Sequence, residues 1–171
     1  RVYRNGWTEW KEYKAKDEFH ESNFFNLSSF NTIVSVGDSL SCGYQRINGA
    51  IISNNYELSP FQYFVKKYGT KVYWGGASGA TSVELLNNDV SNYNSSPYVP
   101  KGFNYIKTLG AKALYIVSLG TNDSSDGTQH VPIGSKDTIN DPTTFYGALN
   151  KIVSEINKIA PSAYILLVSG F

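Results

Sequence analysis

The chain is poor in the residue types that build several common kinds of site. Its 171 residues include no methionine, two histidines and one cysteine. A single cysteine cannot form an internal disulfide, so Cys42 says little about compartment and is interpreted as a small packed residue in a turn. The histidines show no metal-ligand spacing such as His-Glu-x-x-His, so the sequence predicts no metal site.

Charge and long apolar runs are also scarce. Charged residues make up 17% of the chain and the net charge is +1, which provides no electrostatic basis for binding nucleic acid or an anionic membrane. No apolar run approaches the ~18 residues that a membrane span needs, so no membrane insertion is predicted. The chain begins with Arg1 and not with a secretory leader, and we expect it to be part of a longer polypeptide.

Apolar and aromatic residues are plentiful. Hydrophobic residues make up 41% and aromatic residues 15%, with 13 tyrosines, which suits a folded domain with a full core. Exposed tyrosine and tryptophan often face sugar rings, but both are also ordinary strand residues. Contact with carbohydrate is therefore one interpretation of this composition, and strand packing is the other.

Apolar segments alternate between strand and helix patterns from Phe30 onward. Strands are predicted at 33–36, 71–74, 113–119 and 163–168, and helices at 60–68, 81–88, 103–109 and after an Asp141-Pro142 cap. Ser59-Pro60 has the residues of a helix start, and Gly69 those of a helix end. The segment 44–58 is interpreted as a long polar loop. This alternation predicts a parallel sheet with helices on both faces.

Residues 1–29 have a different character. Asn5-Gly6 predicts a two-residue turn within a hairpin over residues 1–13, and residues 14–29 are interpreted as a linker or wrapped loop. We therefore divide the chain into residues 1–29, the end of a preceding domain, and residues 30–171, an α/β domain.

Three short polar segments follow predicted strands. They are Gly37-Asp38-Ser39-Leu40, Ser78-Gly79-Ala80-Thr81-Ser82 and Gly120-Thr121-Asn122-Asp123. Because the carboxyl ends of parallel strands lie at one edge of a sheet, we expect these segments to meet there. A serine hydroxyl is a nucleophile when a base adjoins it, and neutral N–H donors stabilise an oxyanion. Ser39, Gly79 and Asn122 offer these groups.

The two acidic residues of these segments are interpreted as structural. Asp38 adjoins Ser39, and adjacent residues of an extended strand point to opposite faces. We therefore expect Asp38 to brace its loop rather than to act as a catalytic acid. Asp123 adjoins Asn122 in the same way and is left out of the predicted chemistry.

In their residues and order, the three segments resemble the first three blocks of the SGNH (GDSL-type) hydrolases, over residues 30–171. The resemblance implies a three-layer α/β/α sandwich with a flavodoxin-like parallel sheet, and hydrolysis of esters, often acetyl groups on sugars, without a cofactor. It implies Ser39 as the nucleophile, and the Ser39 amide, the Gly79 amide and the Asn122 side chain as the oxyanion hole. Ala80 stands where the second block often has aspartate.

The family's Asp-x-x-His block, which supplies the base, has no match in this sequence. His20 is interpreted as a solvated loop residue, and His130 is an alternative base. Four of the family's five strands are predicted, and without the fifth the strand at 163–168 would be an open apolar edge. We expect the polypeptide to continue past Phe171 with that strand and block. The alternatives are a nicked chain whose remainder stays bound and a truncated domain; the fragment alone is expected to be inactive.

The segment from Tyr3 to Trp10 resembles the closing hairpin of pyocin-knob-type repeats in phage tail and receptor-binding proteins. This resemblance implies an enzyme of a phage tail that acts outside the cell on acylated host polysaccharide. It also implies that the protein could assemble as a homotrimer. The leading prediction is a serine esterase that removes acetyl or other acyl groups from carbohydrate or a small ester. The alternatives are a non-catalytic carbohydrate- or surface-binding tail module and a purely structural tail domain.

Overall fold

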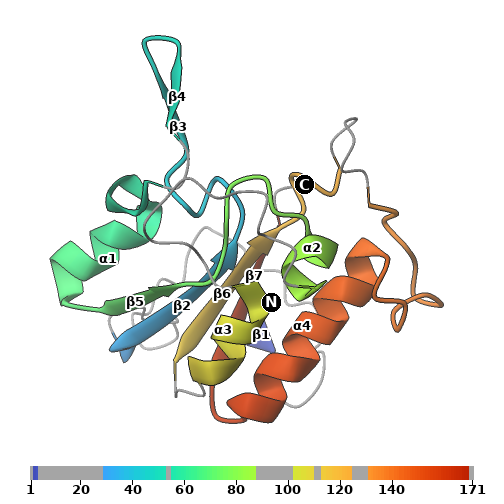
Figure 1. The fold of residues 1–171 in the computed structure, drawn as a ribbon. Helices are drawn as coiled ribbons and strands as arrows, with labels where there is room; N and C mark the ends of the chain where they lie inside the picture. The colour runs from blue at the N-terminus through green and yellow to red at the C-terminus, as the bar shows by residue number, and fades with distance from the viewer. Residues whose placement is uncertain are drawn as a thin grey trace, which may run out of the picture.

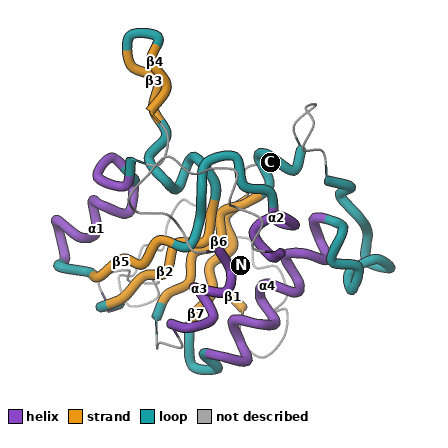
Figure 2. Tube along the Cα trace, viewed as in Figure 1, coloured by secondary structure: helices purple, strands orange, loops and turns teal. Residues whose placement is uncertain are grey.

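A five-stranded sheet lies between two layers of helices (Figure 1). The structure is a computed structural model that describes residues 2–3, 29–52, 55–87, 102–109, 113–124 and 131–169. Helix α1 covers one face of the sheet, and α2, α3 and α4 lie together on the other (Figure 2). The predicted three-layer α/β/α arrangement is confirmed.

Four parallel strands form the main part of the sheet. They are β2 (Thr32–Gly37), β5 (Lys71–Trp74), β6 (Leu114–Leu119) and β7 (Tyr164–Ser169), in the spatial order β7-β6-β2-β5. The three pairings among them are parallel and join the strands predicted from the sequence. The chain leaves β2 toward β5 on one side and later returns to β6 on the other. Such a reversal leaves a crevice outside the carboxyl ends of the two strands at which the order reverses, here β2 and β6.

A fifth strand, β1 (Val2–Tyr3), lies at the edge beside β7. Val2 pairs with Leu166 and Tyr3 with Ile165, and the two strands run antiparallel. The prediction that the edge of β7 is open is therefore wrong at these positions, and the sheet is mixed. Local patterns could not show this pairing, because it joins the two ends of the chain. The rest of the predicted hairpin over residues 1–13 lies outside the described residues.

Helix α1 (Pro60–Tyr68) begins and ends where the sequence predicts. The Ser59 side chain accepts a hydrogen bond from the Phe61 amide at 3.2 Å, and proline occupies the first helical position. The chain leaves the helix at Gly69, whose φ of 66° lies in the left-handed region. A short 3₁₀ helix, η3 (Tyr56–Leu58), directly precedes α1.

The other layer contains α2 (Ser82–Asn87), α3 (Gly102–Leu109) and α4 (Phe145–Ile159). Helix α2 begins with a capping box: Glu84 accepts hydrogen bonds from the Thr81 amide and hydroxyl, and the Thr81 hydroxyl accepts one from the Glu84 amide. The reciprocal bonds stabilise the helix start directly after the second polar segment.

Helix α4 begins later than the sequence predicts. Its N-cap is Thr144, whose hydroxyl accepts a hydrogen bond from the Gly147 amide at 3.1 Å. Asp141 instead closes the preceding turn, because its carboxylate accepts hydrogen bonds from the amide and hydroxyl of Thr143. Asp141-Pro142 has the residues of a helix start, but the Asp141 carboxylate is hydrogen bonded within the turn and does not cap the helix.

The core has two parts, one on each face of the sheet. Tyr115 and Val117 of β6 point to the side of α2, α3 and α4, while Leu114 and Ile116 point to α1 and contact the group that includes Phe61. Strands β2 and β6 are buried on both faces, as expected for central parallel strands. Among the helices that the structure describes, none has the length and apolar character that crossing a bilayer requires.

The segment predicted to be a polar loop contains a hairpin of two short strands, β3 (Gln45–Ile47) and β4 (Ala50–Ile52). Asn48 and Gly49 form its tip with φ values of 51° and 85°. Two consecutive positive φ values are typical of the two-residue turn that Asn-Gly favours. The loop prediction is wrong here, and the Asn48-Gly49 signal was sufficient to find the hairpin.

Candidate active site

The three polar segments lie at one edge of the sheet. Ser39 follows β2, Gly79 follows β5 and Asn122 follows β6, and these strands are parallel neighbours. In Figure 1 this is the upper edge, from which the β3–β4 hairpin rises. The residues that the sequence singles out therefore lie at the carboxyl ends of three neighbouring strands.

Ser39 lies in a tight turn directly after β2. The Cys42 amide donates to the Asp38 carbonyl at 3.1 Å, and the Tyr44 amide donates to the Ser39 carbonyl at 3.0 Å. The Leu40 amide donates to the Asp38 carboxylate at 3.0 Å. These bonds fix the backbone on both sides of Ser39, which is itself partly exposed. The residue is therefore both held in place and accessible from solvent.

Two hydrogen bonds join the segments that carry the candidate residues. The Asn122 side-chain amide donates to the Ala80 carbonyl at 3.0 Å, directly after Gly79. The Asp38 carboxylate accepts a hydrogen bond from the Thr121 side chain. The first segment is thus bonded to the third, and the third to the second, so all three are held together at the same part of the edge.

Backbone packing brings the second segment against Gly37, directly before the turn that contains Ser39. The Ala77 amide donates to the Gly37 carbonyl at 3.0 Å, and a Cβ added at Gly76 would lie 2.0 Å from that same oxygen. Gly76 thus lets the backbone of the second segment approach Gly37 more closely than any side chain would permit. The sequence analysis did not predict this role, although the Gly75-Gly76 pair is present in the sequence. Gly79 adopts a φ of 82°, in the left-handed region that favours glycine.

The two aspartates of these segments are buried and hydrogen bonded. Asp38 is 2% exposed and Asp123 1% exposed. Asp123 accepts hydrogen bonds from the amide and hydroxyl of Ser82, at the start of α2. Burial raises the pKa of both carboxyls; the Ser82 bonds oppose this for Asp123, and the Leu40 amide and Thr121 hydroxyl oppose it for Asp38. Both carboxyls connect loops, in agreement with the structural role predicted for Asp38.

Cys42 is 1% exposed, as predicted for a packed residue. Burial raises the pKa of its thiol to about 12, so the thiol stays protonated at neutral pH and is a poor nucleophile. Next to it, the Tyr56 hydroxyl donates to the Gly76 carbonyl at 3.3 Å. The thiol of Cys42 is therefore a weaker candidate nucleophile than the hydroxyl of the partly exposed Ser39.

Both histidines, His20 and His130, lie outside the described residues. Within the described ranges there is no group of three or more histidine, cysteine, aspartate or glutamate residues that could hold a metal ion. The arrangement thus places a partly exposed serine, a glycine with positive φ and an asparagine side chain at the ends of three neighbouring strands. These groups suit nucleophilic attack on a carbonyl with stabilisation of the resulting oxyanion.

Several solved structures share this fold. A family two carbohydrate esterase from Clostridium thermocellum, solved in complex with cellohexaose, is 19% identical and matches 81% of this chain and 42% of its own, with a TM-score of 0.52. A family two carbohydrate esterase from Cellvibrio japonicus is 20% identical and matches 80% of this chain and 41% of its own, with a TM-score of 0.51. The chain spans less than half the length of either esterase.

A protein of Bacteroides uniformis assigned as a GDSL-like lipase is 20% identical and matches 80% of this chain and 69% of its own, with a TM-score of 0.52. At these identities the likeness shows the fold alone. A sequence comparison with curated proteins finds no match.

Membership of a family rests on a different comparison. The sequence profile described as GDSL-like Lipase/Acylhydrolase matches residues 33–169. This range is most of the chain and contains all three polar segments, together with the four parallel strands. The chain therefore belongs to the GDSL-like lipase/acylhydrolase family and has the α/β fold of the GDSL (SGNH) hydrolases.

Proposed function

We propose that the protein is a serine ester hydrolase with Ser39 as the nucleophile. The Ser39 amide, the Gly79 amide and the Asn122 side chain form the oxyanion hole in this proposal. The observation that carries it is the hydrogen bond from Asn122 to the carbonyl of Ala80, because it fixes a neutral donor beside the residue that follows Gly79. The partial exposure of Ser39 supports access of a substrate to the hydroxyl.

The reaction follows from these groups. The Ser39 hydroxyl oxygen attacks the ester carbonyl carbon while a base takes its proton, and the carbonyl oxygen becomes an oxyanion facing the three N–H donors. The tetrahedral intermediate then collapses, the alcohol leaves with a proton, and an acyl group remains on Ser39. Water hydrolyses this acyl-enzyme by the same steps. Donors that are already oriented need no reorganisation during the reaction.

A base must accept the proton of Ser39. The proposal assigns it to a histidine, either that of an Asp-x-x-His block, as the family resemblance implies, or His130 as the alternative within this sequence. Hydrolysis of a chromogenic acetate ester by a His130→Ala variant distinguishes the two assignments of the base. Full turnover in a His130→Ala variant assigns the base elsewhere, and loss of turnover assigns it to His130.

For the substrate, we propose acyl groups on carbohydrate, with acetyl as the first candidate. Two solved structures with this fold are those of carbohydrate esterases, and one of them was obtained with cellohexaose. The abundance of tyrosine agrees with contacts to sugar rings. A place in a phage tail, with a homotrimeric assembly, is a further proposal that rests only on the resemblance of residues 3–10.

The test uses the full-length natural polypeptide with a chromogenic acetate ester and an acetylated saccharide. Ser39→Ala is expected to lower kcat at least about a thousandfold, since binding and oxyanion stabilisation alone sustain only weak turnover. Ser124→Ala, a change at an exposed serine in the loop of Asn122, is the matched control and is expected to be active. Turnover that survives Ser39→Ala would refute the nucleophile. Saccharide binding without turnover in the unmodified protein would identify a non-catalytic module instead.

A further inference from the structure

The β3–β4 hairpin, which we call the arm (residues 45–52), follows directly on the turn over residues 38–44 that contains Ser39, which we call the nucleophile turn. The Tyr44 amide, which immediately precedes the arm, donates to the Ser39 carbonyl at 3.0 Å. At the other end of the arm, Asn55 lies against the same turn, since a Cβ added at Gly43 would be 2.0 Å from the Asn55 carbonyl oxygen. Both ends of the arm are therefore held against this turn, one at Ser39 and the other at Gly43.

The base of the arm is also tied to the body of the domain. The Ser59 hydroxyl donates to the Ser41 carbonyl at 2.7 Å, and the same hydroxyl caps α1. An added Cβ at Gly43 would also lie 2.9 Å from the Ser59 amide nitrogen. The nucleophile turn, the arm and the start of α1 thus form one packed unit, so a ligand bound by the arm is held at a defined place relative to Ser39.

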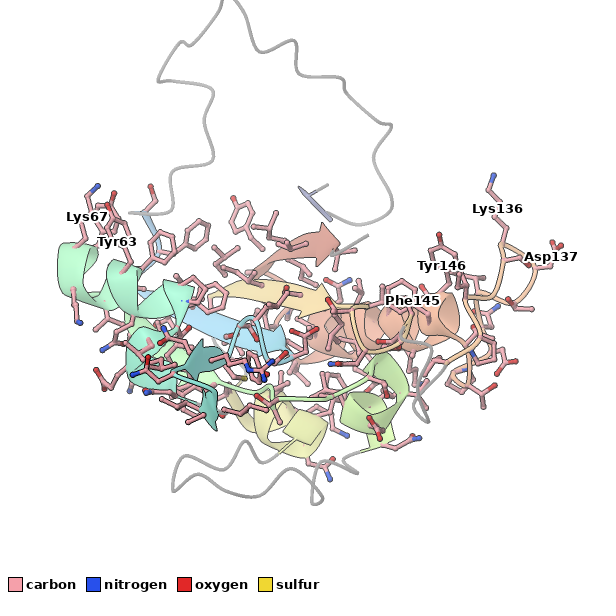
Figure 3. The ribbon with its side chains drawn as sticks, turned by 90° about the horizontal axis from the view of Figure 1, so that it is seen from above. Tyr63, Lys67, Lys136, Asp137, Phe145 and Tyr146 are labelled. Carbon is pink, nitrogen blue, oxygen red and sulfur yellow. The ribbon has the colours of Figure 1, made fainter. Side chains whose placement is uncertain are left out.

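The arm itself projects away from the sheet (Figure 1). Ile47 is 45% exposed and Ile51 61% exposed, and Tyr44 at its base is 40% exposed. A two-stranded hairpin has little stability of its own in water, and neighbouring exposed apolar side chains are typical of a binding surface. By contrast, the exposed aromatic residues Tyr63 and Tyr146 lie at opposite ends of the molecule, on α1 and α4 (Figure 3).

Each face of the arm combines apolar and polar side chains. Cross-strand partners share a face, so Arg46 lies with Ile51 on one side, and Gln45 lies with Ile52 on the other. A surface that inserts into lipid would have one wholly apolar face. Guanidinium and amide donors beside aliphatic and aromatic groups instead suit a hydroxyl-rich chain, which has both polar edges and apolar ring faces.

We propose that the arm binds sugar units next to the acylated unit, so that the substrate is an acylated polysaccharide chain rather than a small free ester. This inference rests on the proposed function of Ser39. Because the arm begins at Gln45, directly after Tyr44, and its other end lies against Gly43 of the same turn, the polymer it holds passes the nucleophile. A small ester reaches Ser39 without touching the arm, so the arm contributes to binding only when the substrate is long.

The experiment compares the full-length natural protein with an Arg46→Ser/Ile47→Ser/Ile51→Ser variant, in which the backbone of the arm is kept. A second variant replaces residues 45–52 with two glycines, and Ile133→Ser, at an isoleucine that is 53% exposed on another loop, is the matched control. Acetate release is measured from 4-nitrophenyl acetate, from acetylated glucose and from chemically acetylated xylan, mannan and pectin.

We expect the triple variant to lower kcat/KM on the preferred polymer about tenfold or more and to leave 4-nitrophenyl acetate within about twofold. The arm deletion should do the same, and Ile133→Ser should change neither rate. Equal losses on polymer and small ester, an unchanged polymer rate, or a parent protein that deacetylates glucose as fast as every polymer would overturn the proposal. A change from oligomer to monomer in the triple variant would also overturn it, because the arm would then be an interface between copies. Absence of all activity in the parent refutes the proposed function itself.

Discussion

Replacing Asn122 with alanine tests the oxyanion hole separately from the nucleophile. The side-chain amide of Asn122 donates to the Ala80 carbonyl at 3.0 Å, and an amide nitrogen carries two N–H groups. In the proposed mechanism the side chain also donates to the oxyanion. Alanine removes both contributions, and each has a different magnitude and a different readout.

The catalytic loss should be much larger than the structural one. Removing one oxyanion donor typically raises the barrier by about 3 kcal/mol, so kcat should fall about 10² to 10³-fold, with a small change in KM. Loss of the hydrogen bond to Ala80 should lower the free energy of unfolding by about 1 kcal/mol. For a protein of this size that corresponds to a fall in Tm of about 2 to 4 °C.

The assay is steady-state hydrolysis of a chromogenic acetate ester by the full-length protein, with Tm measured on the same preparations. Ser124→Ala again serves as the control, since the Ser124 hydroxyl bonds the Thr121 carbonyl in the same loop and is exposed. A kcat within about threefold of the parent for Asn122→Ala would refute the oxyanion role. A Tm fall of more than about 10 °C would show that the side chain acts mainly by holding the second and third segments together.

Two further predictions concern stability. Gly76→Ala should lower the free energy of unfolding by about 3 kcal/mol or more, because its Cβ would lie 2.0 Å from the Gly37 carbonyl oxygen. Gly69→Ala, with open space around the added Cβ, should lower it by only about 1 kcal/mol. Equal losses for the two variants in denaturant titrations would contradict the close approach at Gly76. Asp123→Asn should gain stability relative to the parent as pH rises from about 4. Burial raises the pKa of Asp123 in the folded state, so the parent loses stability as the carboxyl ionises in the unfolded state. Asparagine does not ionise, and its side-chain oxygen can still accept the hydrogen bond from the Ser82 amide. A stability difference that stays flat or falls as pH rises from about 4 would contradict the buried-carboxyl interpretation.

Most of the regular structure could be predicted because its signals are local. The start of α1 depends on Ser59 and Pro60, which are adjacent, and its end depends on the conformational freedom of Gly69. Strand β6 is an unbroken apolar run, so its central position follows from burial on both faces. The local signal was misleading at Asp141. An aspartate can cap a helix or close a turn, and here it closes the turn, while Thr144 caps the helix three residues later.

The sequence by itself determined the four parallel strands, the helices between them and the order of three polar segments at the strand ends, because each depends on residues close together in the chain. Only the tertiary structure decided that β1 pairs with β7 and that Asp38 and Asp123 connect separate loops. It also decided that Gly76 lies against Gly37. These contacts join residues far apart in the chain, and their energies depend on burial and hydrogen-bond geometry that exist only once the sheet has formed.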